Sequence, residues 1–197
     1  MQQKESTRRS NRDRSEETRG KLLKAARTLF VEKGYAETGT PEIVKAAAVT
    51  RGALYHHFAD KADLFRAVVV QEATAVAGEI ESAALDLSDP IEALVTGAEA
   101  YFRAMRAAGR ARILLIDGPA VLGADALAEI DRETGGGTLH AGLAHAAQRH
   151  GRSDLPLEEL AQLLSAAFDR AALAVSEGAD PTVYATAMRE LLTGLFR

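Results

Sequence analysis

The sequence predicts an all-α fold, and three observations support this prediction. Alanine, the best intrinsic helix former, accounts for 39 of the 197 residues. Apolar residues recur at the three- and four-residue spacing of helices, and no segment alternates strictly between apolar and polar residues as a strand would. Glycine and proline residues separate the periodic segments, so we expect about nine to ten helices.

The N-terminal segment divides into a polar arm and an amphipathic helix. Residues 1–15 are rich in charge and lack apolar periodicity, which predicts a flexible basic arm. From Glu16 onward, apolar residues recur on one helical face as far as Phe30. Gly34 can supply the left-handed residue that ends such a helix, so the first helix is expected to stop just before it.

Three further helix starts follow, each with a candidate capping residue. Thr40 precedes a proline and predicts a short helix over residues 41–47. Thr50 is expected to cap a second short helix that ends near residue 58. Asp60 is expected to cap a longer helix that runs to about residue 85.

The remainder of the chain predicts a larger helical body. Its clearest helix start is Asp89-Pro90, where a capping residue precedes a proline at the first helical position. The expected helices span residues 90–107, 111–122, 124–133, 136–150, 156–177 and 181–195. The predicted organisation is an arm over residues 1–15, a unit of three helices over 16–62 and a body over 63–197, joined through a shared helix rather than by a linker.

The net charge of −4 conceals two regions of opposite sign. Residues 1–66 hold 14 Lys and Arg against 9 Asp and Glu, whereas residues 67–197 hold 10 against 19. All six lysines lie at or before Lys61. A basic end on an acidic body is typical of a protein whose one end binds a polyanion, although a solvated basic tail would have the same composition.

Composition and motifs also exclude several classes of function. The absence of Cys excludes disulfides, thiolate metal sites and cysteine nucleophiles. The longest apolar runs are too short for a membrane helix, and the first residues contain no apolar signal segment, so we expect a cytoplasmic protein with no membrane partner. His140, His145 and His150 do not share a helix face, so neither a metal nor another cofactor is expected. No nucleophile motif or acid pair suggests an active site, which leaves an enzyme as the less favoured alternative.

The stretch from residue 40 to residue 61, TPEIVKAAAVTRGALYHHFADK, carries the most specific pattern. It predicts two short helices joined by a tight turn, with their apolar residues facing inward, as in a helix-turn-helix. On the second helix Arg51 and Tyr55 share an exposed surface, as do Gly52 and His56. This surface suits DNA, because Arg can donate to guanine, hydroxyl and imidazole groups reach phosphates or base edges, and Gly permits close approach. Two short surface helices with polar outer faces are the alternative.

The segment from about Thr18 to Val70 resembles the DNA-binding domain of the TetR family of bacterial transcription regulators. The resemblance depends mainly on the string GALYHHF at residues 52–58, with Asp60-Lys61 and Leu64-Phe65 after it. It implies a homodimer whose recognition helices enter successive major grooves of a pseudo-palindromic operator, and a body whose ligand changes their separation. The predicted DNA contacts are Thr40, Thr50, Arg51, Gly52, Tyr55, His56, His57 and Lys61, the last as a phosphate contact. The predicted function is therefore a repressor released by a ligand, and the alternative is a dimeric DNA-binding protein without a ligand switch.

Two positions depart from the pattern of the family. Ala48 stands where Gly is common in the turn, so a positive φ there would cost about 1 kcal/mol. The sequence Gly39-Thr40-Pro41 is an unusual entry to the second helix. This entry weakens the expectation that Thr40 contacts a phosphate.

The body offers one candidate wall for a ligand pocket. Tyr101, Phe102 and Met105 share one side of the 90–107 helix in a chain with few aromatic residues, although such residues also form ordinary core. The body contains no Lys, which favours a small, mostly apolar effector over a multiply anionic one. The predicted ligand-binding residues are Phe65, Val69, Tyr101, Phe102, Met105, Leu114 and Asp117.

The last two helices are apolar on more than one side. A helix with two apolar sides is covered on both, so we expect these Ala-rich helices to pack against those of a second copy in a four-helix interface. Burial within a single protomer is the alternative. The predicted interface residues are Leu160, Leu164, Phe168, Tyr184, Met188, Leu191 and Leu195.

Overall fold

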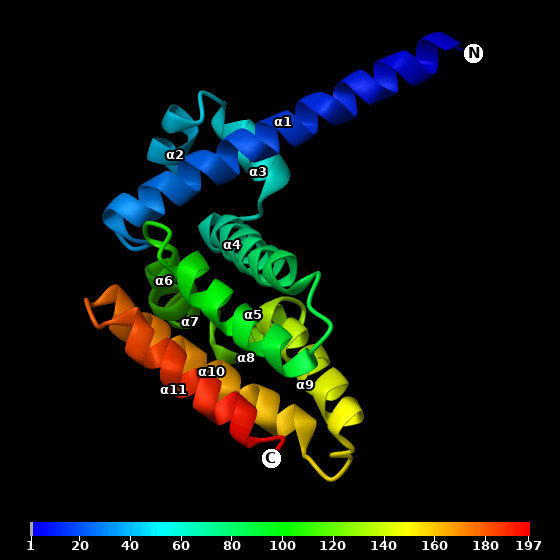
Figure 1. Cartoon of the computed structure of the whole chain (residues 1–197). Helices are drawn as coiled ribbons and strands as arrows, with labels where there is room; N and C mark the ends of the chain where they lie inside the picture. Colours follow the sequence, from blue (N-terminus) through cyan, green and yellow to red (C-terminus); the bar gives the residue numbers. More distant parts are fainter. Residues whose placement is uncertain (1) are drawn as a thin grey trace. The chain divides into compact units, whose positions relative to one another are not determined.

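The computed structural model describes the backbone of residues 2–197 and, from residue 11 onward, the side chains. Every regular element in this range is a helix, which confirms the all-α prediction (Figure 1). The chain forms two compact units, Met1–Val69 and Val70–Arg197, and the boundary falls inside α4 (Lys61–Ala84). The sequence placed this boundary a few residues earlier in the same helix.

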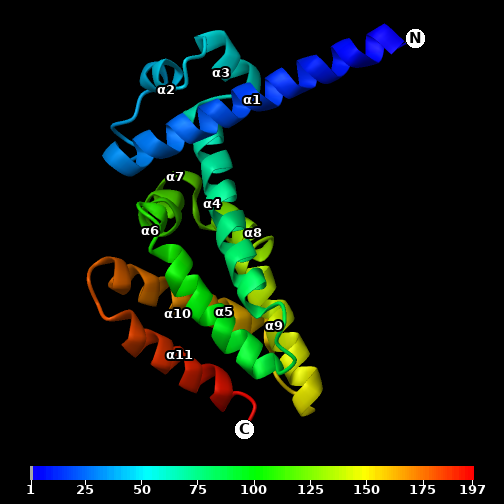
Figure 2. The same ribbon diagram turned by 45° about the horizontal axis from the view of Figure 1, so that its top comes forward.

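The first unit contains α1 (Gln2–Lys33), α2 (Thr40–Ala46), α3 (Arg51–His57) and the start of α4. Helices α2 and α3 pack against α1 and against each other (Figure 2). The buried residues Ile43 of α2 and Leu54 of α3 belong to the core of this unit. In the same core, the ring of Phe30 of α1 meets the ring of Phe65 of α4 edge-on, with centroids 5.1 Å apart.

Helix α1 begins at Gln2, where the sequence predicted a flexible arm through residue 15. Residues 2–15 contain neither proline nor glycine, so nothing in this segment interrupts a helix. Arg12 and Glu16 form an ion pair in which Nε and Oε1 are 3.1 Å apart. Ion pairs between residues four apart in the sequence stabilise polar helices. The segment predicted as a flexible basic arm is therefore helical from Gln2 onward in the structure.

Side-chain caps fix the starts of the next helices. The predicted caps Thr50, Asp60 and Asp89 are confirmed: their side-chain oxygens accept backbone N–H groups at 3.1, 2.8 and 2.9 Å. Thr40 is not a cap, because Gly39 is the N-cap residue of α2 and Thr40 is the first helical residue. The Thr40 side chain is therefore free to interact with α3.

The second unit holds the rest of α4 and a series of shorter helices. These are α5 (Pro90–Met105), α6 (Arg110–Arg112), the π-helix η1 (Ile113–Asp117), α7 (Gly118–Leu122), α8 (Ala124–Arg132), α9 (Gly135–His150), α10 (Leu157–Ser176) and α11 (Pro181–Gly194). Most bounds agree with the predictions within a few residues. The exception is the predicted helix over 111–122, which contains the π-helix: the Gly118 N–H donates to the carbonyl of Ile113, five residues earlier, and α7 follows with Pro119 in its first turn.

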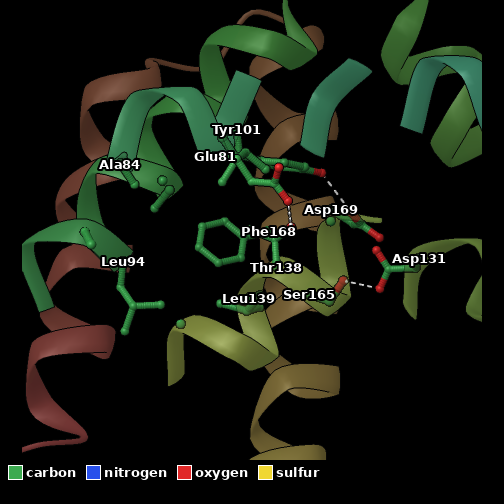
Figure 3. Close-up of a pocket in the computed structure, with 16 residues that line it drawn as sticks. Glu81, Ala84, Leu94, Tyr101, Asp131, Thr138, Leu139, Ser165, Phe168 and Asp169 are labelled. Carbon is green, nitrogen blue, oxygen red and sulfur yellow. Dashed lines mark hydrogen bonds between the residues drawn. The ribbon is translucent and has the colours of Figure 1, made fainter. Parts of the chain in front are cut away.

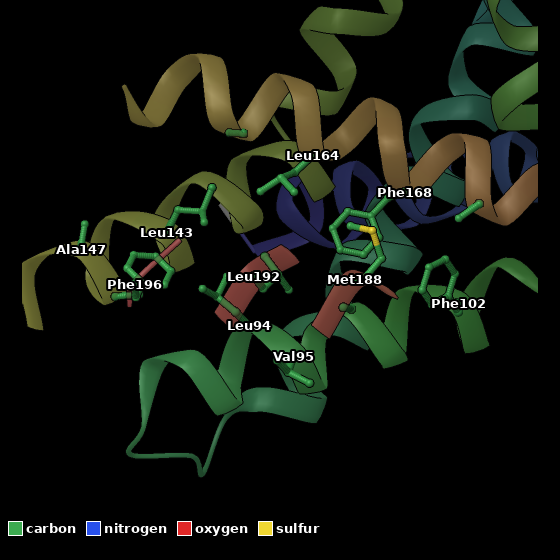
Figure 4. Packing of buried hydrophobic residues seen from close by; sticks show 14 residues of the cluster. Leu94, Val95, Phe102, Leu143, Ala147, Leu164, Phe168, Met188, Leu192 and Phe196 are labelled. Atoms are coloured by element: carbon green, nitrogen blue, oxygen red, sulfur yellow. The ribbon is translucent and has the colours of Figure 1, made fainter. Parts of the chain in front are cut away.

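Helices α5, α9, α10 and α11 enclose the main core of the second unit (Figure 4). Leu143 and Leu192 are fully buried in it. A buried ion pair supplements this apolar packing, since the Arg110 guanidinium donates to Glu72 and Glu79 of α4, each at 2.9 Å. Helix α6 is thereby tied to the part of α4 that belongs to this unit.

Candidate DNA-binding surface and body cavity

The turn between α2 and α3 depends on a left-handed residue. Ala48 has a φ of +53°, so the strained turn anticipated at this position is present. The N–H groups of Ala48 and Val49 donate to the carbonyls of Lys45 and Val44 at 3.2 and 3.1 Å, which closes the end of α2. The turn directs α3 across α2 in the geometry of a helix-turn-helix.

Helix α3 buries one side and exposes the other. Leu54 is fully buried, whereas Arg51, Gly52, Tyr55 and His56 are exposed, as predicted from their spacing. The exposed side chains come from two adjacent turns and form one continuous polar surface. Such a surface has the donors, aromatic groups and low bulk that a major groove accommodates.

The polar groups on α3 are held in position by their neighbours. Hydrogen bonds from Thr40 and Arg51 lower the pKa of Tyr55, so Thr40 supports α3 from the start of α2. The Arg51 guanidinium lies 5.5 Å from the centre of the Tyr55 ring. His57 is half-buried, and its burial is the main cause of a lowered pKa, to which repulsion from His56 and Arg19 adds. The lowered pKa makes His57 harder to protonate, which does not favour attraction of phosphate.

Lys61 has a structural role that the sequence did not reveal. Its Nζ donates to the carbonyls of Tyr35 and Thr38 at 2.9 and 3.1 Å and lies 4.0 Å from the centre of the Tyr35 ring. These contacts hold the start of α4 to the loop between α1 and α2. The ammonium group predicted to contact phosphate is therefore largely engaged within the protein.

The predicted ligand residues are dispersed rather than gathered at one site. Phe65 packs against Phe30 in the core of the first unit, and Val69 is fully buried at the end of that unit. Phe102 and Met105 line an open hollow between the ends of α5 and α10, while Leu114 and Asp117 lie in the π-helix. Asp117 is 3.3 Å from the guanidinium of Arg112. Tyr101 is the predicted residue that reaches the apolar cavity described next.

A cavity of about 150 Å³ lies in the second unit, between α4, α5, α8, α9 and α10 (Figure 3). Most of its wall is apolar, and Phe168, Leu139 and Leu94 contribute large side chains. Polar groups occupy one side, where the Tyr101 hydroxyl donates to Asp169 at 2.7 Å and the Ser165 hydroxyl donates to Asp131 at 3.0 Å.

Sequence reasoning missed most of this cavity. Glu81, Asp131, Ser165 and Asp169 come from three different helices, and each looks like an ordinary surface residue within its own segment. The residues one turn from Asp169 on its helix include Ser165 as well as Ala166, Ala172 and Leu173, a mixture that is ordinary for a surface position. Local periodicity therefore gave no signal for this residue and does not show which distant groups face it.

The predicted dimer residues fall into two groups. Leu164, Phe168 and Met188 are buried in the protomer's own core, because α10 and α11 turn these side chains toward α5 and α9. Assigning these three to an interface is therefore inconsistent with their positions. Leu191 is 53% exposed, and the half-buried residues of the predicted set pack at the edge of the core: Leu160, Tyr184 and Leu195.

The outer faces of α10 and α11 carry apolar residues that the prediction omitted. Leu163 is 69% exposed and Val183 is 63% exposed. The sequence predicted that this helix is apolar on two sides but did not show which side faced outward. The structure shows that the side with Leu164 faces the core and that Leu163 lies on the outer side.

Other kinds of site find little support in the described part of the chain. Among residues 11–197, whose side chains the structure describes, no group of three or more His, Asp or Glu is placed to hold a metal ion. His140 instead lies 3.9 Å from Glu158, and His150 lies beside the ring of Phe196. None of the helices within these residues is both long and apolar enough to span a bilayer.

The exposed face of α3 beyond a tight turn, together with a separate helical body, defines a helix-turn-helix DNA-binding protein. Comparison with known families specifies the class further. Residues 22–68 match the bacterial regulatory proteins of the tetR family, and residues 91–197 match the tetracyclin repressor-like C-terminal domain. The chain belongs to the TetR family.

Individual relatives agree with this assignment. The chain is similar to the solved structure of a TetR-family transcriptional regulator from Pectobacterium atrosepticum, with 30% identity, a TM-score of 0.73 and coverage of 94% of this chain and 95% of that chain. It is 40% identical over 87 residues to the transcriptional regulator AcrR of Shigella flexneri, which covers 44% of this chain and 40% of AcrR. The transcriptional activator FasR of Mycolicibacterium smegmatis is 36% identical over 95 residues, 48% of this chain and 43% of FasR. The chain thus spans less than half the length of these curated relatives.

Proposed function

We propose that this protein is a sequence-specific transcriptional repressor that binds operator DNA as a homodimer and releases it when a small ligand enters the body. The observation that carries the proposal is the exposed polar surface of α3, centred on Arg51 and Tyr55, on a helix-turn-helix. The proposed role is that of a regulator rather than an enzyme. It acts in the bacterial cytoplasm, where operator DNA lies.

In the proposed complex, α3 enters the major groove and Arg51 donates to a base edge. Thr50, Gly52, Tyr55 and His56 lie on or beside the same surface and complete the contact. Two copies related by a two-fold axis would read a pseudo-palindrome whose half-sites are about 34 Å apart, or a multiple of that distance. The acidic body, which carries 19 Asp and Glu against 10 Lys and Arg over residues 67–197, would stay off the DNA.

The proposed dimer uses the outer faces of α10 and α11. A turn of four residues joins these helices, so they run antiparallel and bring Leu163 and Leu191 to the same end of the pair. Small exposed residues such as Ala166 and Ala187 lie on the same outer faces and permit close approach of a second pair. The interface thereby keeps the predicted helices and Leu191 but replaces the buried Leu164 by Leu163.

Anisotropy titration tests the DNA-binding part of the proposal. Duplexes from the DNA that flanks the protein's own gene are compared with shuffled duplexes of the same length and composition at physiological salt. The best duplex should bind about 10³-fold more tightly than its shuffled version. A ratio below about tenfold would contradict sequence-specific regulation.

The ligand switch is tested separately. A thermal-shift screen identifies molecules that stabilise the protein, and each is then added to the complex with the best duplex. An effector should weaken DNA binding by about 5- to 150-fold, the usual range of coupling between two sites. Ligands that stabilise the protein without changing DNA affinity would favour a dimeric DNA-binding protein that has no switch.

A further inference from the structure

The cavity in the second unit combines an apolar wall with charge of a single sign. Its volume of about 150 Å³ is enough for a small ring compound. The side chains of Ile80, Leu94, Leu139 and Phe168 supply the apolar surface. Three acidic residues line it, Glu81, Asp131 and Asp169, and the described lining residues include no Lys, Arg or His. An organic anion would therefore meet repulsion on entry.

The three carboxylates differ in how many hydrogen bonds they accept from the protein. Both oxygens of Asp131 accept hydrogen bonds, from the Gly136 N–H at 3.1 Å and from the Ser165 hydroxyl at 3.0 Å. Glu81 accepts from Thr138 at 3.1 Å and is largely exposed. Asp169 accepts from the Tyr101 hydroxyl through Oδ1, while its Oδ2 receives no hydrogen bond from the described residues. Asp169 thus has an oxygen available to a ligand.

The surroundings of Asp169 disfavour its negative charge. Burial raises the pKa of Asp169 to about 6, and repulsion from Asp131 adds to this effect, whereas the Tyr101 hydrogen bond opposes it. Figure 3 shows the carboxylates of Asp131 and Asp169 next to each other. At neutral pH Asp169 is ionised, and the described residues provide it with no Lys or Arg partner. A cation that enters the cavity would supply the missing charge.

We propose that this cavity binds an organic monocation, in which an ammonium group is attached to a compact apolar skeleton. The ammonium group donates to Asp169 and is attracted by Asp131, while the apolar part packs against Phe168 and Leu139. The rings of Tyr101 and Phe168, whose centroids are 5.5 Å apart, can add cation–π attraction. The inference rests on the proposed function, because it takes the occupant of the cavity to be the effector.

Three ligands of nearly equal size and different charge test this inference on the full chain. Phenethylamine, phenethyl alcohol and phenylacetate carry a positive charge, no charge and a negative charge at about pH 8. Isothermal titration calorimetry should show that the amine binds at least about tenfold more tightly than the alcohol and that the acid binds most weakly. An amine that binds no better than the alcohol would overturn the proposal. This comparison uses the unaltered protein and does not depend on any variant folding.

A substitution then assigns the preference to one carboxylate. Asp169→Asn keeps an oxygen for Tyr101 but removes the charge, so the amine should lose its advantage while the alcohol binds as before. Asp125→Asn, which removes an exposed charge on α8 away from the cavity, is the matched control and should change neither affinity. Retention of the amine preference in Asp169→Asn would contradict the assignment.

Acidification provides an independent check of the same charge. Protonation of Asp169 between about pH 8 and pH 5 should reduce the amine preference, since its pKa is about 6. Glu81 from α4 and Asp131 from α8 face the same cavity, and Tyr101 from α5 remains neutral throughout this range. A preference that is unchanged at pH 5 would exclude Asp169 as the group that selects the cation.

DNA titrations distinguish failure of this inference from failure of the proposed function. If amines bind through Asp169 but leave the DNA affinity unchanged, the proposed cation site is supported and the proposed release of DNA by a ligand is wrong. If neutral or anionic ligands release the DNA regardless of Asp169, the release of DNA by a ligand is supported and the proposed cation site is wrong. If phenethylamine releases DNA from the unaltered protein but not from Asp169→Asn, both are supported.

Discussion

The two units of this protein present their candidate functional groups in opposite ways. In the first unit, Arg51, Gly52, Tyr55 and His56 lie within six consecutive residues and face outward from one short helix. In the second unit, the wall of the cavity is assembled from α4, α5, α8, α9 and α10, and its polar groups are partly buried. One surface depends on the order of residues along a helix, whereas the other depends on how five helices pack.

This difference explains why function is more apparent in one unit than in the other. Exposed residues on a short helix are under little packing constraint, so an unusual combination such as Arg, Gly, Tyr and His indicates a binding role. In the body, an aromatic or acidic residue has the same appearance whether it lines a cavity, fills the core or covers the surface. Only the packing of distant helices separates these cases.

The largest effect is expected from two neighbouring leucines of the body that face opposite ways. Leu164→Arg would place an unpaired charge in the protomer core and should abolish stable folding of the body, a loss of at least about 4 kcal/mol. Leu163→Arg, on the outer face, should leave the helical content intact but convert dimers to monomers. Circular dichroism measures the helical content of the two variants, and sedimentation measures whether they are dimers or monomers. A folded dimer for Leu163→Arg would move the interface elsewhere.

The buried charge in the cavity should lower the stability of the body at neutral pH. Because the pKa of Asp169 is about 6 in the folded chain, above its ordinary 3.8, the folded state binds the proton more tightly. Stability should therefore decline as pH rises from about 4 to 6, by about 3 kcal/mol at most. Asp169→Asn should remove this decline and unfold at higher urea than the unaltered protein at pH 7. This account is contradicted if Asp169→Asn is less stable than the unaltered protein at pH 7 while the control Asp125→Asn is not.

Lys61 tests whether a cation of the first unit serves the fold or the DNA. Lys61→Met removes two charge-assisted hydrogen bonds to backbone carbonyls and should destabilise the first unit by about 1–2 kcal/mol. Lys45→Met, at an exposed position of α2, is the control and should change stability by less than about 0.5 kcal/mol. The contrary result is that Lys61→Met has the same free energy of unfolding as the unaltered protein, while the slope of DNA affinity against salt concentration falls by about one unit. Lys61 would then be the phosphate contact that the sequence predicted.

A smaller effect is expected at the turn between α2 and α3. Ala48→Gly should stabilise the first unit by about 0.5–1 kcal/mol, because glycine adopts the observed positive φ without strain. Ala46→Gly, at the last residue of α2, should instead destabilise it by about 0.5 kcal/mol. Thermal unfolding of both variants gives the sign. Destabilisation by both would show that Ala48 does not hold the left-handed conformation in solution.

Most of the fold could be predicted from local sequence, because helix starts depend on nearby residues. Thr50, Asp60 and Asp89 cap their helices as their positions suggested. The errors arose where a nonlocal contact or an unusual backbone hydrogen bond determines the outcome. A π-helical hydrogen bond from Gly118 to Ile113 interrupts a predicted α-helix, and Lys61 binds carbonyls more than twenty residues away.

The candidate sites show the same distinction between local and nonlocal determinants. The sequence predicted the exposed face of α3 because each side chain there depends on its position within one helix. It could not predict that Leu164 faces inward and Leu163 outward, since both stripes of α10 are apolar. Nor could it bring Asp169 next to Tyr101 and Asp131, which lie in three helices.

The most direct test of the account is the effect of Arg51→Ala on two kinds of DNA. If α3 reads base edges, the variant should lose about 1–3 kcal/mol of affinity for the operator and retain its affinity for shuffled DNA almost unchanged. Anisotropy titration of both duplexes with the unaltered protein and the variant gives the two ratios. An equal loss on operator and shuffled DNA would contradict the claim that the exposed face of α3 recognises sequence.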